Sequence, residues 1–565
     1  MTERTRRMPG SRVTIAIALP VLAILLWTVV YPNIAVIAGS FEGGLQHWRA
    51  FFASPSDREA LRATLVMSIG SVIAATAIGL PLAFLLTRAE FAGRRTLAAV
   101  ATLPAALPPL VGVVAFLFLY GESGVVTRSI QHALKLPAAP WTLSGIPAIV
   151  FVHAYTMYVY VFLFVAAGLE RYDTSLDEAA AGLGAGTLRR LARVTLPLLM
   201  PAIAGAMLLV FMSALGSFSA PYVFGGGIRV LSTQIVTSKL NGAMGLAYVE
   251  TTVLAISAVA ALVLLRWLER RRSYVLVGKG RASHRRLPRN ILVRALLPLL
   301  ATVLVVVLVL PHAMVALVSF AKDGAWTTQV LPPQYTLDNF RRLATDPQLW
   351  TPIRNSVLMA AVATAANVVV CLAAAYLVVM RKFRGRRVLE LLLALPWAIP
   401  ATAIAIGLAS TFNRNDLSSL RVLLVGTFWI LPLAYFVRGI PLVATAVEGS
   451  LRQMDPSTEE AARGLGATTW LTMRRIVLPA VRPGLVAGAM LAAVTAVGEF
   501  VASVVLYTHA NRPISVEILA QLRGFAFGTA AAYSLLLIAL VLLITLGARY
   551  GEGRRERARG SSLAA

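Results

Sequence analysis

Long apolar runs separated by short polar breaks fill the chain along its whole length. An α-helix needs about 20 apolar residues to cross a hydrocarbon core of about 30 Å. Because the runs reach that length with few charges inside them, they predict membrane-spanning helices. Twelve are expected, at residues 13–39, 62–87, 96–120, 145–168, 198–224, 250–268, 293–320, 355–380, 388–411, 422–445, 481–507 and 530–549. The predicted fold class is an all-α polytopic membrane protein.

Prolines inside these runs are expected to kink or break the spans. A proline has no amide hydrogen, so it removes one helical hydrogen bond, which neighbouring helices can compensate inside a membrane. The prolines in question are Pro81, Pro104, Pro108, Pro396 and Pro400.

The first apolar run follows a basic segment, "MTERTRRMPGSR". A cleaved signal peptide has the same order, but its apolar region is only about 7–15 residues long. The run at 13–39 is longer than that. It is therefore predicted to remain as an uncleaved first span.

The second half of the chain repeats the first. "LRATLVM" from Leu61 matches "IRNSVLM" from Ile353, an offset of 292, and "DEAAAGLGA" matches "EEAARGLGA" at an offset of 282. Each half is predicted to hold six spans, an even number, so the two tandem repeats have the same direction in the membrane. The predicted boundaries are a tail at 1–12, a first half at 13–268, a basic linker at 269–292, a second half at 293–549 and a tail at 550–565.

The charge distribution indicates topology rather than nucleic-acid binding. The chain has 565 residues, of which 58% are hydrophobic and 14% charged, with a net charge of +27. The basic residues concentrate in short segments between the spans, as the positive-inside rule predicts for cytoplasmic loops. Nucleic acid is therefore not an expected partner, whereas the lipid bilayer is, and both termini are predicted to be cytoplasmic. The single cysteine, Cys371, can form no intrachain disulfide and is expected to pack in the core.

One polar segment occurs in both halves, between the predicted fourth and fifth spans. Its second copy begins "MDPSTEEAARGLGA", in which Asp455 can cap a helix, Pro456 suits the first turn, and acids complement the positive end of the helix dipole. Glycines then end that helix, and a basic helix leads to Leu-Pro at the next span. The pattern predicts a helix-turn-helix knob on the cytoplasmic side. The alternative is an ordinary connecting loop.

These two segments resemble the signature of the permease subunits of binding-protein-dependent ABC importers: Glu-Ala-Ala, a glycine and a downstream Leu-Pro. In that family the segment docks on a cytoplasmic ATPase. The resemblance assigns ATPase coupling to a set of matching positions in the two halves: Glu178, Ala179, Ala180, Gly182, Glu460, Ala461, Ala462 and Gly464. It implies the type I ABC importer permease fold. ATP and Mg²⁺ would be bound by the ATPase, since this chain contains no G-x-x-x-x-G-K-[ST] sequence of its own.

The presence of two signatures in one chain is similar to the fused permeases, in which one polypeptide supplies both halves. The segments "ALGSFSAPYVFGGG" and "AVGEFVASVVLY" look most like ferric iron permeases, with thiamine, 2-aminoethylphosphonate, polyamine and sulfate permeases as alternatives. The resemblance implies a non-enzymatic transport subunit of a bacterial inner membrane, without catalytic residues or a bound cofactor. Its implied partners are two ATPase copies and a periplasmic or lipid-anchored solute-binding protein.

Three residues are candidates for the transport pathway. Arg438 is a charge near the cytoplasmic end of a span, where the first half has Thr156; it lines a path, pairs with an acid or extends to the interface. Glu499 aligns with Ser217, and either contacts a cationic substrate or serves gating and helix packing. The histidines and acids show no spacing typical of a metal site.

Two other classes of protein remain as alternatives. A secondary transporter of the major facilitator type also has six plus six spans in parallel repeats, and "FAGRRTL" and "FRGRRVL" sit where that family has a basic loop. It would leave the repeated Glu-Ala-Ala segments unexplained, and uptake driven by protons without ATP would favour it. A membrane scaffold without transport would show no nucleotide-dependent movement.

Overall fold

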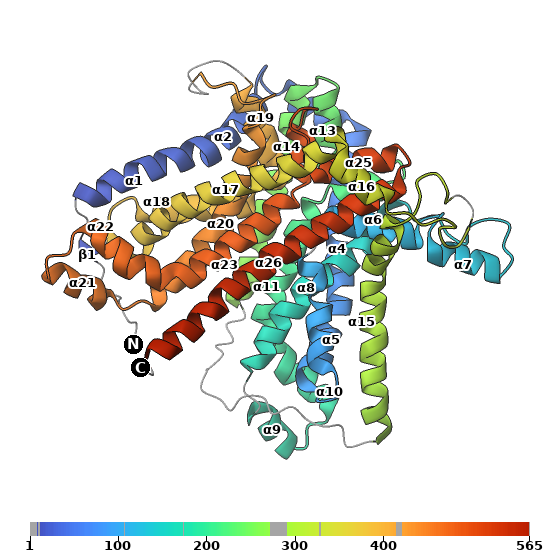
Figure 1. The fold of residues 1–565 in the computed structure, drawn as a ribbon, viewed down its shortest axis with the longest axis horizontal. Coiled ribbons are helices and arrows are strands. Elements are labelled where there is room, and N and C mark those ends of the chain that lie inside the picture. The colour runs from blue at the N-terminus through green and yellow to red at the C-terminus, as the bar shows by residue number, and fades with distance from the viewer. Residues whose placement is uncertain are drawn as a thin grey trace. The chain divides into compact units, whose positions relative to one another are not determined.

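Figure 1 shows the computed structural model, which describes residues 8–9, 12–106, 108–172, 175–271, 291–326, 329–413 and 421–563. The predicted tail at 1–12 and linker at 269–292 fall largely outside these residues. Helices dominate the described part of the chain. The strands there are two residues long, β1 (Met8–Pro9) and β2 (Arg381–Lys382), and they pair in parallel.

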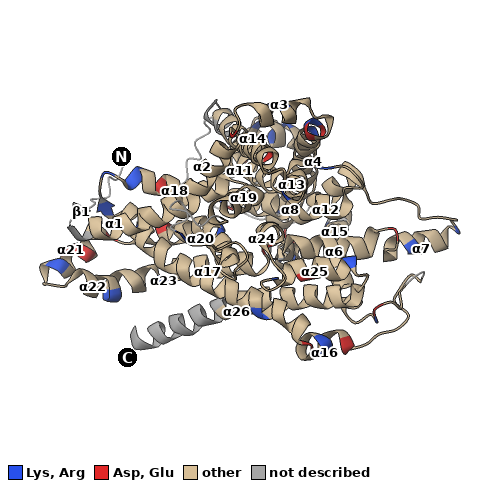
Figure 2. Ribbon diagram, turned by 90° about the horizontal axis from the view of Figure 1, so that it is seen from above, with Lys and Arg blue, Asp and Glu red and all other residues tan. Residues whose placement is uncertain are grey.

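The predicted polytopic helical fold is confirmed. Among the described residues, 11 helices are long and apolar enough to cross a membrane, or up to 12 if one bent pair forms a single span. The positions of charged residues gather toward the ends of the helices and are sparse along them (Figure 2).

The third span of each half breaks at its prolines, as expected. In the second half α18 (Arg386–Ala398) and α19 (Ala401–Phe412) meet at a bend of 110°. In the first half the prediction of one helix from residue 96 is wrong, because α5 (Arg94–Ala101) and the 3-10 turn η2 (Leu103–Ala106) precede α6 (Pro109–Tyr120). A residue before proline disfavours helical backbone, and both breaks contain a proline followed by a new helix start.

The fifth spans begin and end earlier than predicted. Helix α11 (Leu196–Leu215) ends at Gly216 and is followed by the short α12 (Ser219–Phe224). Helix α23 (Leu478–Val497) ends at Gly498 and is followed by α24 (Val501–Leu506). Continuous spans over 198–224 and 481–507 are therefore incorrect. The interruption occurs at matching positions in the two halves.

Wide helical turns relieve the clash of proline with the preceding helix. The three π-helical segments of the described chain are η1 (Leu26–Val30), η3 (Leu191–Thr195) and η4 (Met473–Val477). In each case a proline lies two residues after the end of the segment, at Pro32, Pro197 and Pro479. A proline ring collides with the carbonyl four residues earlier, and a wider turn makes room for it.

The chain divides into two compact units. Unit 1 comprises residues 1–47, 338–524 and 533–565, and unit 2 comprises residues 48–337 and 525–532. Besides elements already given, unit 1 contains α1 (Arg12–Leu25), α2 (Tyr31–Gly39), α16 (Asp338–Thr345), α17 (Pro347–Met380), α20 (Ile430–Gln453), α21 (Pro456–Gly464), α22 (Thr469–Thr472), α25 (Ile514–Arg523) and most of α26 (Phe527–Leu563). Unit 2 contains most of α3 (Gln46–Ala53), then α4 (Pro55–Arg88), α7 (Val125–Ala133), α8 (Gly145–Glu170), α9 (Ser175–Gly182), α10 (Thr187–Arg190), α13 (Leu231–Leu240), α14 (Met244–Arg271) and α15 (Ile291–Ser319).

The first span of each sequence half belongs to the unit built mainly from the other half. Helices α1 and α2 pack against α17, α18 and α19 in unit 1, and α15 packs against α4, α5 and α6 in unit 2. In Figure 1 the yellow-green α15 runs beside the blue α5. The compact units therefore differ from the two sequence repeats, and the predicted repeat boundaries at 13–268 and 293–549 stay a prediction.

A group of three packed helices forms the centre of each unit. In unit 2 these are α4, α8 and α11, and in unit 1 they are α17, α20 and α23. Glycines allow the helices to approach closely: a Cβ at Gly79 of α4 would lie 2.5 Å from the carbonyl oxygen of Tyr158, and one at Gly488 of α23 would lie 2.9 Å from the Cα of Val443. Cys371 is fully buried in the unit 1 group.

Candidate functional site

The two repeated polar segments fold into the predicted helix-turn-helix knobs. The first knob, residues 175–195, consists of α9, a turn, α10 and η3; the second knob, residues 456–477, consists of α21, a turn, α22 and η4. Asp455 caps α21, since its side chain accepts a 2.9 Å hydrogen bond from the amide of Ser457, which lowers the pKa of Asp455. The residues just before α9, 173 and 174, lie outside the described chain.

Each knob helix ends in the same hydrogen-bonded turn. In the first knob the amide of Ala185 donates to the carbonyl of Ala180 at 3.0 Å, and the amide of Gly184 donates to that of Ala181 at 3.0 Å. The second knob repeats both bonds, from Ala467 to Ala462 and from Gly466 to Arg463. This pair of bonds is the Schellman motif, which requires left-handed backbone at one residue.

Glycine provides that left-handed residue in both knobs. Gly184 has a φ of +80° and Gly466 a φ of +83°. Gly182 and Gly464 instead lie inside the last helical turn, and a Cβ at either would meet no atom within 4 Å. Of the two glycines in each copy, the turn thus needs only the second. Nothing within the described chain requires Gly182 or Gly464 to lack a side chain.

The residues of the Glu-Ala-Ala signature lie mostly on the solvent-exposed side of the knob helices. Glu178 and Ala179 are exposed, as are Glu460 and Ala461. The third residue differs slightly between the copies, since Ala180 is half-buried and Ala462 is buried. The signature therefore presents carboxylates and small apolar side chains outward.

Sequence reasoning missed two further positions on the knobs. Leu183 and Leu465, at the helix ends, are each 90% exposed, and Leu188 and Trp470, at the start of the following helix, are 79% and 73% exposed. A single exposed leucine needs no explanation, but large apolar residues at the same two positions of both copies indicate a surface that becomes covered. The offset of 282 between the copies was the signal that identifies them.

The acid before each signature glutamate is buried in an ion pair, which the sequence did not reveal. In the first knob Asp177 Oδ2 accepts a 2.9 Å hydrogen bond from Arg88 Nη1, and its Oδ1 accepts one from Thr195 at 3.1 Å. In the second knob Glu459 pairs with Arg381 and accepts a 2.7 Å hydrogen bond from Tyr376. Asp177 is 8% exposed and Glu459 is fully buried.

The three pathway candidates lie near the interrupted fifth spans. Arg438 of α20 forms an ion pair with Glu499, with 2.7 Å between Nε and Oε2. Of the three interpretations of Arg438, the structure therefore shows the pairing with an acid. The other carboxylate oxygen of Glu499 accepts a hydrogen bond from the backbone amide of Ala502, at the start of α24. In unit 2 the hydroxyl of Ser217 lies 2.8 Å from Nε2 of His153. Their roles in transport stay predictions.

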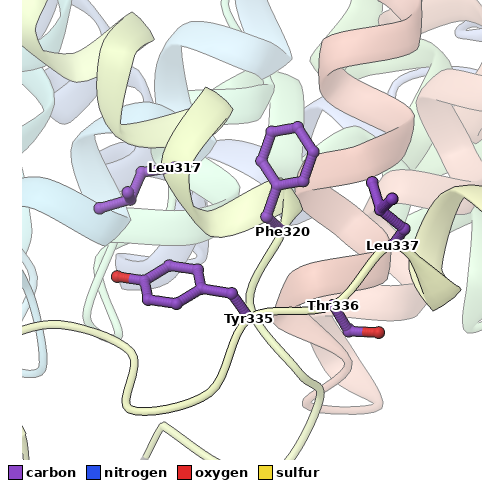
Figure 3. Close-up of a pocket in the computed structure, with 5 residues that line it drawn as sticks. All are labelled: Leu317, Phe320, Tyr335, Thr336 and Leu337. Atoms are coloured by element: carbon purple, nitrogen blue, oxygen red, sulfur yellow. The ribbon is translucent and has the colours of Figure 1, made fainter.

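A metal site and a solute-binding pocket are two further kinds of functional site to consider in the described chain. No group of three or more His, Cys, Asp or Glu side chains there is placed to hold a metal ion. A shallow depression of about 400 Å³ in unit 2 is lined by Leu317, Phe320, Tyr335, Thr336 and Leu337 (Figure 3). Its lining has no acid or basic residue to orient a charged solute.

Comparison with known proteins matches both halves of the chain to one family. The sequence profile of the family described as "Binding-protein-dependent transport system inner membrane component" matches residues 75–274 and again residues 368–557. Each matched range contains one knob.

Individual relatives are also permeases. The probable ABC transporter permease protein y4fN of Sinorhizobium fredii is 29% identical over 86% of each chain. The ferric transport system permease protein FbpB of Actinobacillus pleuropneumoniae is 26% identical over 96% of this chain and 79% of its own. The sulfate transport system permease protein CysT of Escherichia coli is 31% identical over 39% of this chain and 84% of its own.

Proposed function

This chain belongs to the family of binding-protein-dependent transport system inner membrane components, and from that premise we propose that it forms the substrate pathway of an ATP-driven importer and couples to two cytoplasmic ATPase subunits. It acts as a transport subunit rather than an enzyme, like the permeases to which it is similar. ATP hydrolysis takes place on the ATPase subunits.

The observation that carries the proposal is the duplication of the knobs. A homodimeric partner with two-fold symmetry offers two equivalent docking sites, so a single-chain partner must offer two similar surfaces. The two knobs have the same Schellman turn, the same exposed leucine and an exposed glutamate at the same position. An ordinary connecting loop has no need to keep all three features in both halves.

The knob surface also matches the chemistry of a protein groove. Leu183 and Leu465 would each contribute about 1.5–3 kcal/mol on full burial. Gly182 and Gly464, which the chain itself does not need, leave the adjacent helix surface flat for close approach. We therefore assign the knobs to ATPase docking and place them, with both termini, on the cytoplasmic side of a bacterial inner membrane.

We further propose Fe³⁺ as the substrate, delivered by a periplasmic or lipid-anchored solute-binding protein. The support is the similarity to a ferric permease over nearly the whole chain. The Arg438–Glu499 ion pair is neutral as a whole, so it would not trap a highly charged cation in transit. Sulfate is the alternative favoured by a specific finding, the similarity of a sulfate permease to 39% of this chain. Thiamine, 2-aminoethylphosphonate and polyamines remain further alternatives.

Reconstitution into liposomes tests both parts of the proposal. The chain is combined with its ATPase inside the liposomes and its binding protein outside. Uptake of radioactive Fe³⁺ is then measured with ATP or with ADP enclosed in the lumen. We expect uptake with ATP only, which excess sulfate does not reduce. Uptake driven by a proton gradient without ATP would contradict the importer proposal, and ATP-dependent uptake of sulfate in place of iron would contradict the substrate alone.

A further inference from the structure

Each knob is attached to its unit by more than the peptide chain. The chain itself connects α9 to α8 on one side and to α11 on the other, and it connects α21 to α20 and α23 in the same way. Those helices are two of the three that pack together at the centre of each unit. The third, α4 in unit 2 and α17 in unit 1, has no direct covalent link to the knob.

An ion pair to a buried carboxylate supplies the missing link in both units. Arg88 is the last residue of α4, and it binds Asp177 in the first turn of α9. Arg381 directly follows α17, and it binds Glu459 in α21. In each unit the ion pair therefore joins the C-terminal end of α4 or α17 to the first helix of the knob.

The surroundings of each carboxylate hold it in place. The Arg88 guanidinium also lies over the ring of Tyr172, 4.7 Å from its centre, and Arg381 lies over Tyr376 at 4.9 Å. A buried carboxylate that loses its cation retains an uncompensated charge, so each pair resists separation.

The two units fasten the same position with different partners. In unit 2 the hydroxyl that donates to the acid comes from Thr195, at the end of η3. The matching residue in unit 1 is Val477, and there the hydroxyl comes from Tyr376 of α17, while Arg463 adds a second cation 3.1 Å from Glu459. The acid is thus common to both knobs even where its surroundings differ, which points to the acid's own function.

We propose that Asp177 and Glu459 are positioning residues that fasten the knobs to α4 and α17, so that a displacement of a knob moves all three central helices of its unit as one body. This inference rests on the proposed docking of an ATPase. The outward-facing glutamates Glu178 and Glu460 contact the partner, and the inward-facing acids beside them transmit its movement to the membrane.

The test uses the full chain with its ATPase and binding protein in liposomes. The variant Asp177→Asn with Glu459→Gln keeps the side-chain shapes and removes both charges. We expect the ATPase to co-purify with it as with the natural chain, and the amount of substrate imported per ATP hydrolysed to fall by about tenfold or more. A merely stabilising role would lower the amount of complex but leave that ratio unchanged.

Two further variants serve as controls. Asp177→Glu with Glu459→Asp keeps both charges and is expected to recover most of the import per ATP. Arg452→Gln removes an exposed ion pair with Glu448 beside the second knob and is expected to behave like the natural chain. If the Asn/Gln variant does not assemble, Asp177→Asn alone, at the less buried pair, decides the question by the same ratio.

The outcomes separate the two proposals. A natural chain that binds no ATPase would refute the proposed function. A natural chain that binds ATPase, together with an Asn/Gln variant whose import per ATP is normal, would overturn the positioning role of Asp177 and Glu459 only.

Discussion

Leu183 and Leu465 occupy the same position in two identical helix-ending turns and are equally exposed, at 90% each. They are 282 residues apart in sequence and belong to different compact units. Each leucine is the last residue before the left-handed glycine of its Schellman turn. Two equally exposed leucines at matching positions are what the proposed docking on a symmetric ATPase dimer requires.

Replacing both leucines by serine is expected to weaken ATPase binding without unfolding the permease. The loss of buried apolar surface would cost about 1.5–3 kcal/mol at each knob, which corresponds to about 10–150-fold in affinity for each. Titration of the purified permease with the ATPase measures this. Leu240→Ser, at a leucine outside the knobs that is 79% exposed, is the control. Unchanged affinity in the double variant would remove Leu183 and Leu465 from the docking surface.

Alanine substitution distinguishes the two glycines that the knobs have in common. Gly182→Ala with Gly464→Ala should leave the fold intact and favour the knob helices by about 0.5–1 kcal/mol each, yet reduce ATPase binding because a methyl group then stands on the docking surface. Gly184→Ala with Gly466→Ala forces alanine into left-handed backbone and should lower stability by about 1 kcal/mol at each turn. Thermal unfolding and ATPase titration of the two variants provide the comparison. Equal binding by the first variant and the natural chain would contradict a flat docking surface.

Glu178→Gln together with Glu460→Gln tests the signature glutamates. Both side chains are exposed, so the permease is expected to fold and insert normally. Loss of the two carboxylates should separate ATP hydrolysis from transport, with ATP still hydrolysed while uptake falls. Assays of ATP hydrolysis and uptake on the same liposomes reveal this. Normal uptake in the double variant would show that these carboxylates do not couple the subunits.

Much of the fold follows from the sequence because hydropathy and repetition act over long stretches. The apolar runs predict the helices, and the matching "DEAAAGLGA" and "EEAARGLGA" predict the two knobs. The prolines of the third spans correctly marked the breaks there. The end of the fifth spans at Gly216 and Gly498 was missed, since apolar residues resume after each glycine, from Phe218 and from Phe500.

The partners of buried charges were not predictable in the same way. Arg88 aligns with Met380 in the repeat, whereas the arginine that serves the second knob is Arg381, one residue later. That shift conceals the equivalence in any residue-by-residue alignment. The exchange of α1 with α15 between the compact units is equally hidden, because an apolar helix surface does not specify which apolar helix covers it.

The Arg438–Glu499 pair is expected to stabilise unit 1 through mutual compensation of charge. Glu499 is 5% exposed and the Arg438 side chain 27%, so removing one partner should cost about 1–3 kcal/mol, less than for a fully buried pair. Replacing both, as Arg438→Met with Glu499→Gln, should restore part of that loss. The unfolding temperatures of the two single variants and the double variant form the test. Strictly additive losses would indicate that the pair contributes no interaction energy.

The composition of the assembled complex tests most directly whether one chain carries both docking surfaces. The permease, co-purified with its ATPase in detergent or nanodiscs, can be weighed intact by native mass spectrometry. We predict one copy of this chain with two copies of the ATPase, and loss of the ATPase when both knobs carry serine at positions 183 and 465. A complex with two copies of this chain for two ATPase copies would contradict the claim that the duplicated knobs serve one ATPase dimer.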